Sequence, residues 1–473
     1  MLRPSPLRRI VSLMTCALLT SGAAQVRFAE HPGSTRLVFD VPQATGAAGH
    51  VTSLGLSIEL SGARPVPERR RLQTAAGTVT VDVAGTTIQV QAPGHPLQLL
   101  TLPAGDGKPF RVVVDVLATS PVKASGPALI PQPVAAACPG VPDTSAVPSL
   151  PLKLPVGVTG NVSFMAAVID PVSLKPLRVA MLNPDAVHPM ASTFKQLVLW
   201  SVLRDVDAGR LSLSQTFTVT PQNRSLESYV PGTRTVLQLA TASISRSENT
   251  AADILMRATT PDRVQDLVNS VGTCATSVLM PTKAYWSVQT GLLPKLFGPA
   301  HLLAATAPLM TADEPTRRAL ARRAVLASLQ VDVGRLNAAL DHFDQGGYDP
   351  RIVWQVENRT TPREMVDLIS HAYLRNGLSA AQNRLYWDLM KDGCCRPDSK
   401  AGYRYWGAKS GVDWGLLNLT GLVQTPDGQY VAYAYMNHQS RTHDVQALQA
   451  QKPLVTAWIA SVFKRLTRAD ERP

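Results

Sequence analysis

The sequence lacks the features that mark metal-binding, nucleic-acid-binding and multi-span membrane proteins. Its five cysteines include no C-x-x-C pair and no histidine cluster accompanies them, so we expect no metal site and no cofactor. No basic run alternates with aromatic residues, which argues against nucleic-acid binding. After the first 24 residues no stretch is long and apolar enough to span a bilayer. What is left is a chain of 473 residues, enough for two or three domains with sizeable cores.

The beginning of the chain has the pattern of a secretory signal. Three arginines precede an apolar run from Ile10 to about Thr20, and small residues follow up to Ala24. This pattern predicts cleavage after Ala24 and export to the periplasm or cell envelope; the alternative is a single membrane anchor, for which the run is short. Removal of residues 1–24 lowers the formal net charge from +12 to +9. A basic exported protein suits anionic surfaces such as cell-wall polymers or lipid headgroups.

Residues 25–117 alternate apolar and polar positions in the manner of half-buried strands. The alternation is clearest at 35–41, 78–83, 87–91 and 110–116, and no helical period of useful length occurs. We therefore expect a small all-β sandwich domain. It has no cluster of catalytic residue types, which indicates binding or spacing.

Two segments of this domain, Ser34–Asp40 and Pro109–Asp115, resemble the AMIN module of cell-wall amidases and envelope proteins. That resemblance implies localisation to peptidoglycan or the envelope. Residues 118–158, rich in proline, alanine, serine and valine, then predict a semi-extended linker to a second domain of residues 159–473.

Four cysteines follow the signal: Cys138, Cys274, Cys394 and Cys395. In an exported chain this number suggests two disulfides. Since adjacent cysteines rarely bond each other, we expect Cys394 and Cys395 to pair with Cys138 and Cys274, in either order. Such bonds would tie the linker to the second domain. The alternative is free, buried thiols.

One stretch of the second domain suits nucleophilic catalysis. Ser192 and Lys195 are three residues apart and share a face if the segment is helical. The apolar run of residues 197–202 follows with helical pattern, so Ser192 is expected in the first turn of a buried helix. Unpaired backbone N–H groups and the helix dipole favour an oxyanion there. A serine hydroxyl needs a base to take its proton, and Lys195 can do so when neutral.

The Ser-x-x-Lys spacing is not specific by itself. It occurs again at Ser120 and Lys123, within the proline-rich stretch, and at Ser461 and Lys464, on the expected terminal helix. The default interpretation of such a pair is a surface serine beside a solvated lysine. Other motifs must distinguish Ser192.

Three motifs in order supply that distinction. Ser192-Thr193-Phe194-Lys195, Ser247-Glu248-Asn249 and Lys409-Ser410-Gly411 resemble the S-x-x-K, S-D-N and K-T-G motifs of class A β-lactamases and penicillin-binding D,D-peptidases. Thr360-Thr361-Pro362 also resembles class A sequence, and the resemblance extends over roughly residues 159–467. It implies an α+β fold, in which an antiparallel sheet built from both ends of the domain packs against a helical lobe. Ser192 would lie at their junction.

The resemblance also assigns roles to side chains. Ser192 would be acylated and Lys195 would be its base, its pKa lowered by burial and by the charge of Lys409. Ser247 would relay protons to the leaving nitrogen. The substrate would be bound by Asn249 at the amide and by the Lys409-Ser410-Gly411 segment at the carboxylate. The backbone N–H groups of Ser192 and Val412 would form the oxyanion hole.

The sequence departs from the family pattern in the second motif and before Thr360. Glu248 replaces an Asp that is mostly structural. The E-x-x-L-N motif that supplies the deacylation base of class A enzymes is missing, and the nearest match, residues 333–337, begins with valine. The segment between Ser247 and Thr360 is also longer than usual by several dozen residues. Its stretch 314–329 carries four arginines, which are expected either to face solvent or to contact an acidic wall polymer.

We expect no catalytic role for three histidines. His188 is close to the nucleophile in sequence, but packing is the simpler role for it. His438 and His443 follow the last expected strands, where solvated loop residues are the default.

The sequence thus predicts an exported two-domain serine hydrolase of class A β-lactamase type that is acylated at Ser192 by β-lactams and hydrolyses them. The first alternative is a D-Ala-D-Ala carboxypeptidase or endopeptidase acting on peptidoglycan stem peptides, since β-lactams and these peptides share a carboxylate beside an amide. The second is a wall-binding protein without turnover.

Overall fold

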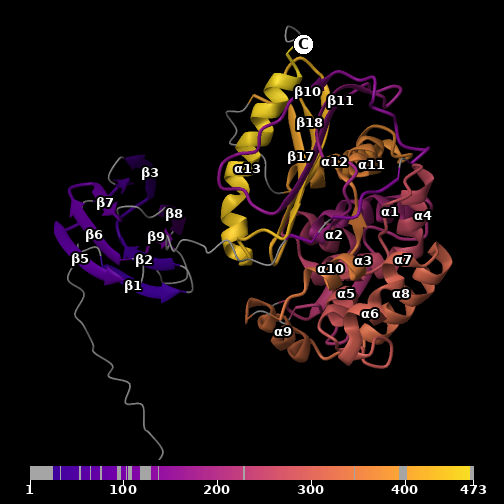
Figure 1. Cartoon of the computed structure of the whole chain (residues 1–473), viewed down its shortest axis with the longest axis horizontal. Helices are drawn as coiled ribbons and strands as arrows, with labels where there is room; N and C mark the ends of the chain where they lie inside the picture. Colours follow the sequence, from indigo (N-terminus) through magenta and orange to yellow (C-terminus); the bar gives the residue numbers. More distant parts are fainter. Residues whose placement is uncertain are drawn as a thin grey trace, which may run out of the picture. The chain divides into compact units, whose positions relative to one another are not determined.

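The computed structural model of the chain describes residues 25–468 apart from 32–33, 53–54, 64, 75–76, 93–96, 103, 105–108, 118–128, 131, 137, 227–228, 346 and 394–401. The chain divides into two compact units after Pro127 (Figure 1). The expected signal segment and both Cys394 and Cys395 lie outside the described residues. Within the described part, no helix has the length and hydropathy needed to cross a membrane.

The first unit consists of two antiparallel sheets. Leu37 and Phe39 of one sheet and Ile58, Val81 and Ile88 of the other are buried in a single hydrophobic cluster. The alternation seen in the sequence therefore places every second side chain between the sheets. The all-β prediction is confirmed; the likeness to the AMIN module stays a prediction. The four-stranded sheet has the order β1 (Gln25–His31), β2 (Ser34–Asp40), β9 (Arg111–Leu117), β8 (Leu97–Leu102), and the five-stranded sheet has the order β3 (Gly46–Thr52), β4 (Gly55–Ser61), β7 (Thr87–Gln91), β6 (Gly77–Ala84), β5 (Glu68–Thr74).

The second unit is built on a six-stranded sheet that takes strands from both ends of the domain. Neighbouring strands are antiparallel except the short β10, which pairs with β12 in parallel. The strand of the Lys409-Ser410-Gly411 motif, β17, is at the edge of the sheet. The order is β10 (Ser149–Leu150), β12 (Pro176–Leu182), β11 (Asn161–Ile169), β19 (Tyr430–His438), β18 (Leu416–Gln424), β17 (Tyr405–Asp413).

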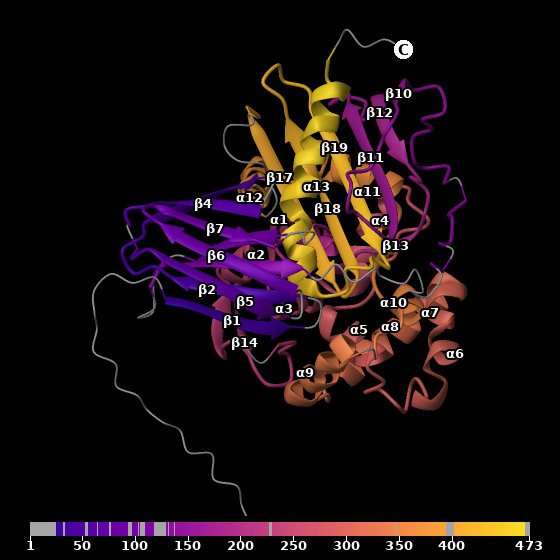
Figure 2. The same cartoon turned by 60° about the vertical axis from the view of Figure 1, so that its left-hand side comes forward.

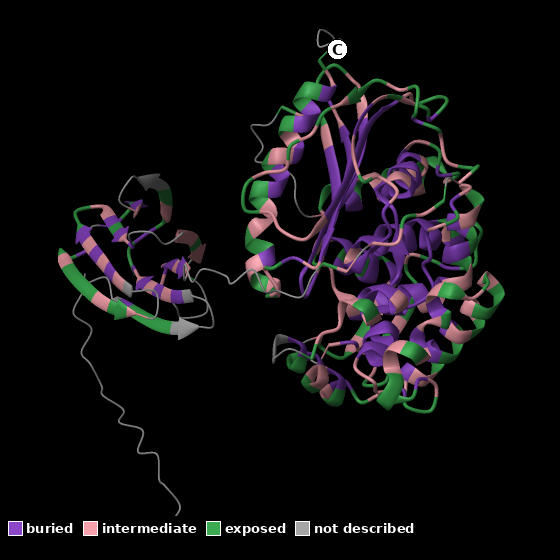
Figure 3. Ribbon diagram, viewed as in Figure 1, coloured by how far each residue is buried: buried purple, intermediate pink, exposed green. Residues whose placement is uncertain are grey.

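Both faces of this sheet are covered, which explains why its strands are apolar almost throughout. Phe164 and Tyr433 point to one face and share a cluster with residues of the terminal helix α13 (Val445–Leu466). Met165 and Ala434, one residue further on in each strand, point to the other face and join the cluster of the helical lobe. Figure 2 shows α13 along one face of the sheet, and Figure 3 shows the strands buried between the layers. The α+β prediction is confirmed.

The helical lobe contains the predicted nucleophile and the long segment before Thr360. Ser192 lies in a 3-10 turn, η1, which continues directly into the first helix, α1. This helix is buried along nearly its whole length. The extra segment forms α6 to α10. The helices are α1 (Lys195–Asp207), α2 (Val236–Ser245), α3 (Asn249–Thr259), α4 (Pro261–Ser270), α5 (Thr282–Gln289), α6 (Leu302–Thr306), α7 (Pro308–Thr311), α8 (Glu314–Ser328), α9 (Val333–Asp341), α10 (Pro350–Val356), α11 (Pro362–Leu374) and α12 (Ala380–Lys391), with 3-10 turns η1 (Ala191–Phe194), η2 (Pro299–His301) and η3 (His342–Gln345); the short strand pairs are β13 (His188–Pro189) with β16 (Arg359–Thr360) and β14 (Thr216–Val219) with β15 (Gly232–Thr235).

The predicted linker of residues 118–158 is wrong for its second half. Val134 forms a β-bridge with Ala186, Ile130 donates its backbone N–H to the Gln439 side chain at 2.9 Å, and β10 extends the sheet. These backbone groups find partners on the second unit, so the described residues from 129 to 158 pack as part of it rather than as a spacer. We call residues 129–150 the strap.

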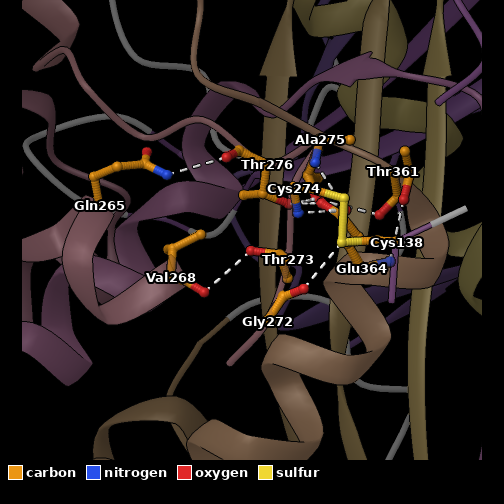
Figure 4. Close-up of a disulfide and its surroundings, with 11 residues drawn as sticks. Cys138, Gln265, Val268, Gly272, Thr273, Cys274, Ala275, Thr276, Thr361 and Glu364 are labelled. Atoms are coloured by element: carbon orange, nitrogen blue, oxygen red, sulfur yellow. Dashed lines mark hydrogen bonds between the residues drawn. A yellow bond between two sulfur atoms is a disulfide. The ribbon is translucent and has the colours of Figure 1, made fainter. Parts of the chain in front are cut away.

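The predicted disulfide pairing is also wrong. Cys138 of the strap bonds to Cys274, with 5.9 Å between the two Cα atoms (Figure 4). Gly140 and Gly272 explain the close approach, because a Cβ added to Gly140 would lie 2.4 Å from the Gly272 carbonyl oxygen. The positions of the cysteines along the sequence do not indicate that these two segments lie close together in the folded protein. The bond does tie the strap to the second unit, as predicted.

Glu364 on α11 accepts hydrogen bonds from the segment that begins at Cys274. Its carboxylate accepts the backbone N–H groups of Cys274 at 2.9 Å and Ala275 at 2.8 Å, and the Thr276 hydroxyl at 2.5 Å (Figure 4). Among the described residues these two cysteines and Glu364 are a group with metal-ligand chemistry. Because the sulfurs are bonded to each other, they are not available as thiolate ligands.

Candidate active site

The turn that carries Ser192 is fixed from two sides. Met190 donates its backbone N–H to the Asn358 carbonyl at 2.7 Å, and the Asn418 side chain donates to the Pro189 carbonyl at 2.8 Å. Ala191 has φ of 42°, a left-handed conformation that costs a non-glycine residue free energy. Ser192 is half-buried, whereas every other residue from Ala191 to Leu203 is buried. The turn thus presents one serine side chain toward solvent from a rigid support.

Lys195, the predicted base, is fully buried. Its Nζ donates to the backbone carbonyl of Ser247 at 2.6 Å and to Asn249 Oδ1 at 2.5 Å. Burial lowers its pKa to about 7, against the opposing charges of Asp253 and Glu248. A neutral amine has two N–H donors and one lone pair. Since two acceptors take the donors, the lone pair is available for a hydroxyl proton.

Ser247 connects the two motif lysines. Its Oγ accepts from Lys409 Nζ at 2.8 Å and lies 3.3 Å from Lys195 Nζ. Burial lowers the pKa of Lys409 well below its usual range, and the charges of Lys195 and Lys452 lower it further. Ser247 has φ of 56°, so its placement between the lysines is maintained against backbone strain. The chain Lys195–Ser247–Lys409 is a continuous path for a proton.

The edge strand β17 passes directly beside the Ser192 turn. A Cβ on Gly411 would lie 2.6 Å from the Met190 carbonyl oxygen and 2.9 Å from the Ser192 nitrogen. The lack of a side chain at Gly411 thus admits the backbone of the turn that carries Ser192. Val412 is half-buried beside it. The two backbone segments that would supply the oxyanion hole are therefore adjacent.

A third lysine, Lys452, approaches the same strand from α13. Its Nζ donates to Ser410 Oγ at 3.3 Å, and burial lowers its pKa. Sequence reasoning missed this residue. The signal was present: Leu448, Val455 and Ile459 form the buried stripe of α13, and Lys452 occupies a position in that stripe where an apolar residue is expected.

The two carboxylates near Lys195 accept hydrogen bonds from backbone N–H groups at the N-termini of helices. Asp253 accepts the backbone N–H groups of Thr282 at 2.6 Å and Lys283 at 2.8 Å, at the start of α5. Glu248, the departure from the second motif, accepts the Thr250 N–H at 3.1 Å and caps α3. Both carboxylates therefore act as hydrogen-bond acceptors at helix N-termini in this arrangement. The missing E-x-x-L-N motif is not replaced by these two residues.

Other candidates from the sequence lie apart from this group. Ser461 is exposed on α13, Ser120 and Lys123 are outside the described residues, and the 333–337 segment forms the start of α9. Of the four arginines on α8, Arg318 and Arg322 pair with the Asp262 carboxylate. Those two charges are thus already partnered within the protein.

His188 and His438 form a buried pair that the sequence did not indicate. Their Nδ1 atoms are 3.1 Å apart, and the Gln132 amide of the strap lies 2.8 Å from His188 Nε2. Burial lowers the pKa of both rings, that of His438 to about 3. His188 packs as expected, whereas the default of a solvated loop residue for His438 is wrong. His443 contacts the ring of Tyr348.

The comparison with protein families decides the identity of the second unit. The model of the β-lactamase enzyme family matches residues 172–458. The chain belongs to this family. The extended-spectrum β-lactamase PER-1 of Pseudomonas aeruginosa is 32% identical over 123 residues, which are 24% of this chain and 39% of that enzyme. The chain thus aligns with about two fifths of the length of this curated relative.

Solved structures of low identity were found as well. A β-lactamase from Chitinophaga pinensis is 17% identical, with a TM-score of 0.43, over 64% of this chain and 94% of that one. PBP-A is 17% identical, with a TM-score of 0.43, over 67% of this chain and 99% of that one.

Proposed function

We propose that the protein is an exported serine hydrolase that is acylated at Ser192 by β-lactams and releases the hydrolysed product. The observation that carries this proposal is the proton path: Lys195 and Lys409 both contact Ser247 Oγ, beside the one half-exposed serine of the nucleophile turn. A lysine with a pKa of about 7 is largely neutral in the physiological range and can act as the base. Membership of the β-lactamase family agrees with this role.

In the proposed acylation, these residues act in sequence. Neutral Lys195 takes the proton of the Ser192 hydroxyl as its oxygen attacks the lactam carbonyl carbon. The backbone N–H groups of Ser192 and Val412 stabilise the resulting oxyanion. When the C–N bond of the ring breaks, Ser247 gives its proton to the leaving nitrogen and recovers one from Lys195 through their contact. The product is an ester at Ser192.

The substrate carboxylate would be bound at the end of the edge strand. Lys409 and Lys452 both lie next to Ser410, whose hydroxyl accepts from Lys452 Nζ. Two lysines, which take up or share a proton with a bound anion, and a hydroxyl suit the carboxylate that β-lactams and D-Ala-D-Ala peptides share. Asn249, which accepts from Lys195, would donate its amide N–H to the carbonyl beside the scissile bond.

The missing E-x-x-L-N motif supports a second candidate, a D-Ala-D-Ala carboxypeptidase or endopeptidase of peptidoglycan. Both carboxylates that act on Lys195, Asp253 and Glu248, bind helix N-termini instead of facing the ester. A peptidase uses the same acylation chemistry and needs only modest turnover. The all-β first unit would then bring the enzyme to wall polymer.

Two substrates distinguish these functions. Mature protein is incubated with a chromogenic cephalosporin and, separately, with an acylated D-Ala-D-Ala peptide, and colour change and free D-Ala are followed. Sustained cephalosporin turnover supports the β-lactamase, and D-Ala release supports the peptidase. If Ser192 acquires no acyl group and neither product forms, the proposal is wrong, and retained binding to wall sacculi would support a binding protein without turnover.

A further inference from the structure

Two buried carboxyl groups meet behind the nucleophile turn. Glu357, just before β16, accepts the Ala191 backbone N–H on Oε2 at 3.3 Å and the Gln289 amide on Oε1 at 3.1 Å. Asp413, the last residue of β17, accepts the Trp414 N–H at 3.0 Å. The two carboxyl groups are hydrogen-bonded to each other, and both residues are at most 5% exposed. Nothing in the proposed acylation steps uses this pair.

A hydrogen bond between two carboxyl groups requires a proton. Burial raises the pKa of Glu357 well above its usual range, and the charge of Asp413 raises it further. Burial raises the pKa of Asp413 to about 6. We expect the pair to hold one proton and one negative charge at neutral pH, because two buried carboxylates in contact repel each other strongly when both are ionised.

Among the described residues around the pair, no cation offsets a second negative charge. The groups that face the pair are Gln289, Tyr285 and Trp286 from α5, Tyr348 from the loop before α10, and the backbone of the η1 turn. None of these groups is a cation. Burial raises the pKa values of Tyr285 and Tyr348 well above the usual range, so both phenols stay neutral. Loss of the shared proton would therefore push Glu357 and Asp413 apart.

The residues held by the pair are the chain neighbours of the expected oxyanion-hole donors. Ala191, bound by Glu357, directly precedes Ser192, and Asp413 directly follows Val412. Ala191 has the strained φ of 42°, and Gly411 permits close contact between the two backbones. A bridge from Ala191 through Glu357 to Asp413 thus spans the gap between the two N–H groups.

We propose that the singly protonated Glu357–Asp413 pair is a positioning device that sets the spacing of the Ser192 and Val412 N–H groups and loosens it when the shared proton is lost. This role rests on the proposed acylation at Ser192. Glu357 and Asp413 contact neither the serine hydroxyl nor the lysines in the described structure, so they are positioning residues rather than catalytic ones. The acylation rate should consequently fall at alkaline pH as the pair loses its shared proton. We call this fall in rate the alkaline limb.

The test measures the acylation rate of wild type, Glu357→Gln, Asp413→Asn and Glu357→Ala over a range of pH with a fluorescent penicillin. The amide in Glu357→Gln can still accept from Ala191 and donate to Asp413, but it cannot ionise. We expect Glu357→Gln to acylate at near the wild-type rate at neutral pH and to lack the alkaline limb. Glu357→Ala should slow acylation about 10- to 100-fold, with initial non-covalent binding changed less than about twofold.

Asp367→Asn is the matched control, since burial raises the pKa of Asp367 to about 7 but it lies on α11. Its acylation profile should equal the wild-type profile. Protonation is read independently by infrared spectroscopy: the carboxylic-acid carbonyl absorption should lose one component in Glu357→Gln, distinct from the component that Asp367→Asn removes. An unchanged alkaline limb in Glu357→Gln, or a wild-type rate in Glu357→Ala, overturns the positioning role alone. Failure of the wild-type protein to form any adduct contradicts the proposed function itself.

Discussion

Ser247 Oγ lies 2.8 Å from Lys409 Nζ and 3.3 Å from Lys195 Nζ, so one hydroxyl contacts two buried lysines. Two like charges at this separation in a buried site repel strongly. The arrangement therefore favours a state in which at least one lysine is neutral. This is the condition that a lysine base requires.

Replacing Lys195 with methionine should slow acylation by about 100- to 10,000-fold, because the Ser192 proton then has no positioned acceptor. In the proposed mechanism the neutral form of Lys195 is the active one. The acylation rate should therefore rise with pH and reach half of its plateau near the Lys195 pKa of about 7. Rapid-mixing measurements with a fluorescent penicillin check both points. Lys464→Met, in the unrelated Ser-x-x-Lys pair, should acylate normally.

Replacing Lys452 with methionine should weaken non-covalent binding of a carboxylate-bearing β-lactam about 10-fold and leave the acylation rate constant nearly unchanged. The reason is that Lys452 contacts Ser410 but neither Lys195 nor Ser247 through a hydrogen bond. A β-lactam with an esterified carboxylate supplies the internal control, since wild type and variant should bind it equally. Equal loss for both ligands would show that Lys452 acts through packing.

Gly411→Ala should reduce acylation by about 100-fold, because the added Cβ meets the Met190 carbonyl at 2.6 Å and must displace the nucleophile turn. Gly298→Ala is the matched control: a Cβ there meets nothing within 4 Å. Acylation rates and melting temperatures of the two variants are compared. An active Gly411→Ala protein would mean that β17 does not constrain Ser192.

Acid should destabilise the folded protein through the buried histidine pair. The folded-state pKa of His438 is lowered to about 3, and burial also lowers that of His188. Unfolded histidines take up protons below pH ~6.5, so stability is full above that pH and falls as the pH drops toward the folded-state value. Each histidine contributes a loss of about 1.4 kcal/mol per pH unit in this window.

Urea unfolding at about pH 7 and pH 5 measures this effect. The double variant His188→Gln, His438→Gln should lose less stability between the two pH values than wild type does. His301→Gln, at an exposed position, should behave as wild type. If all three proteins show the same pH dependence, the histidine pair is not its source.

The local features of the active site could be predicted from sequence because they depend on short spacings. Ser192 and Lys195 share one turn, and the apolar run after them required a buried helix, which α1 provides. The strands of the first unit were recognisable from their period-two alternation of apolar and polar residues, whereas the sheet of the second unit was expected from the family resemblance.

The features that were missed depend on contacts between distant segments. Cys138 bonds to Cys274, 136 residues away, and spacing alone could not choose that partner. The strap was interpreted as linker because its prolines suit an extended chain, yet extended backbone can also pair with a sheet edge, as β10 does with β12. Glu357 had no sequence signal, because only folding brings it to Ala191 and Asp413.

The measurement that tests the central claim most directly is mapping of the penicillin adduct by peptide mass spectrometry on wild type, Ser192→Ala and Ser461→Ala. Ser461 belongs to an equally spaced Ser-x-x-Lys pair but is exposed on α13, so it controls for chance acylation. We expect one adduct, on the peptide containing Ser192, in wild type and in Ser461→Ala, and none in Ser192→Ala. An adduct that survives in Ser192→Ala, or none on the wild-type protein, would contradict an acyl-enzyme at Ser192.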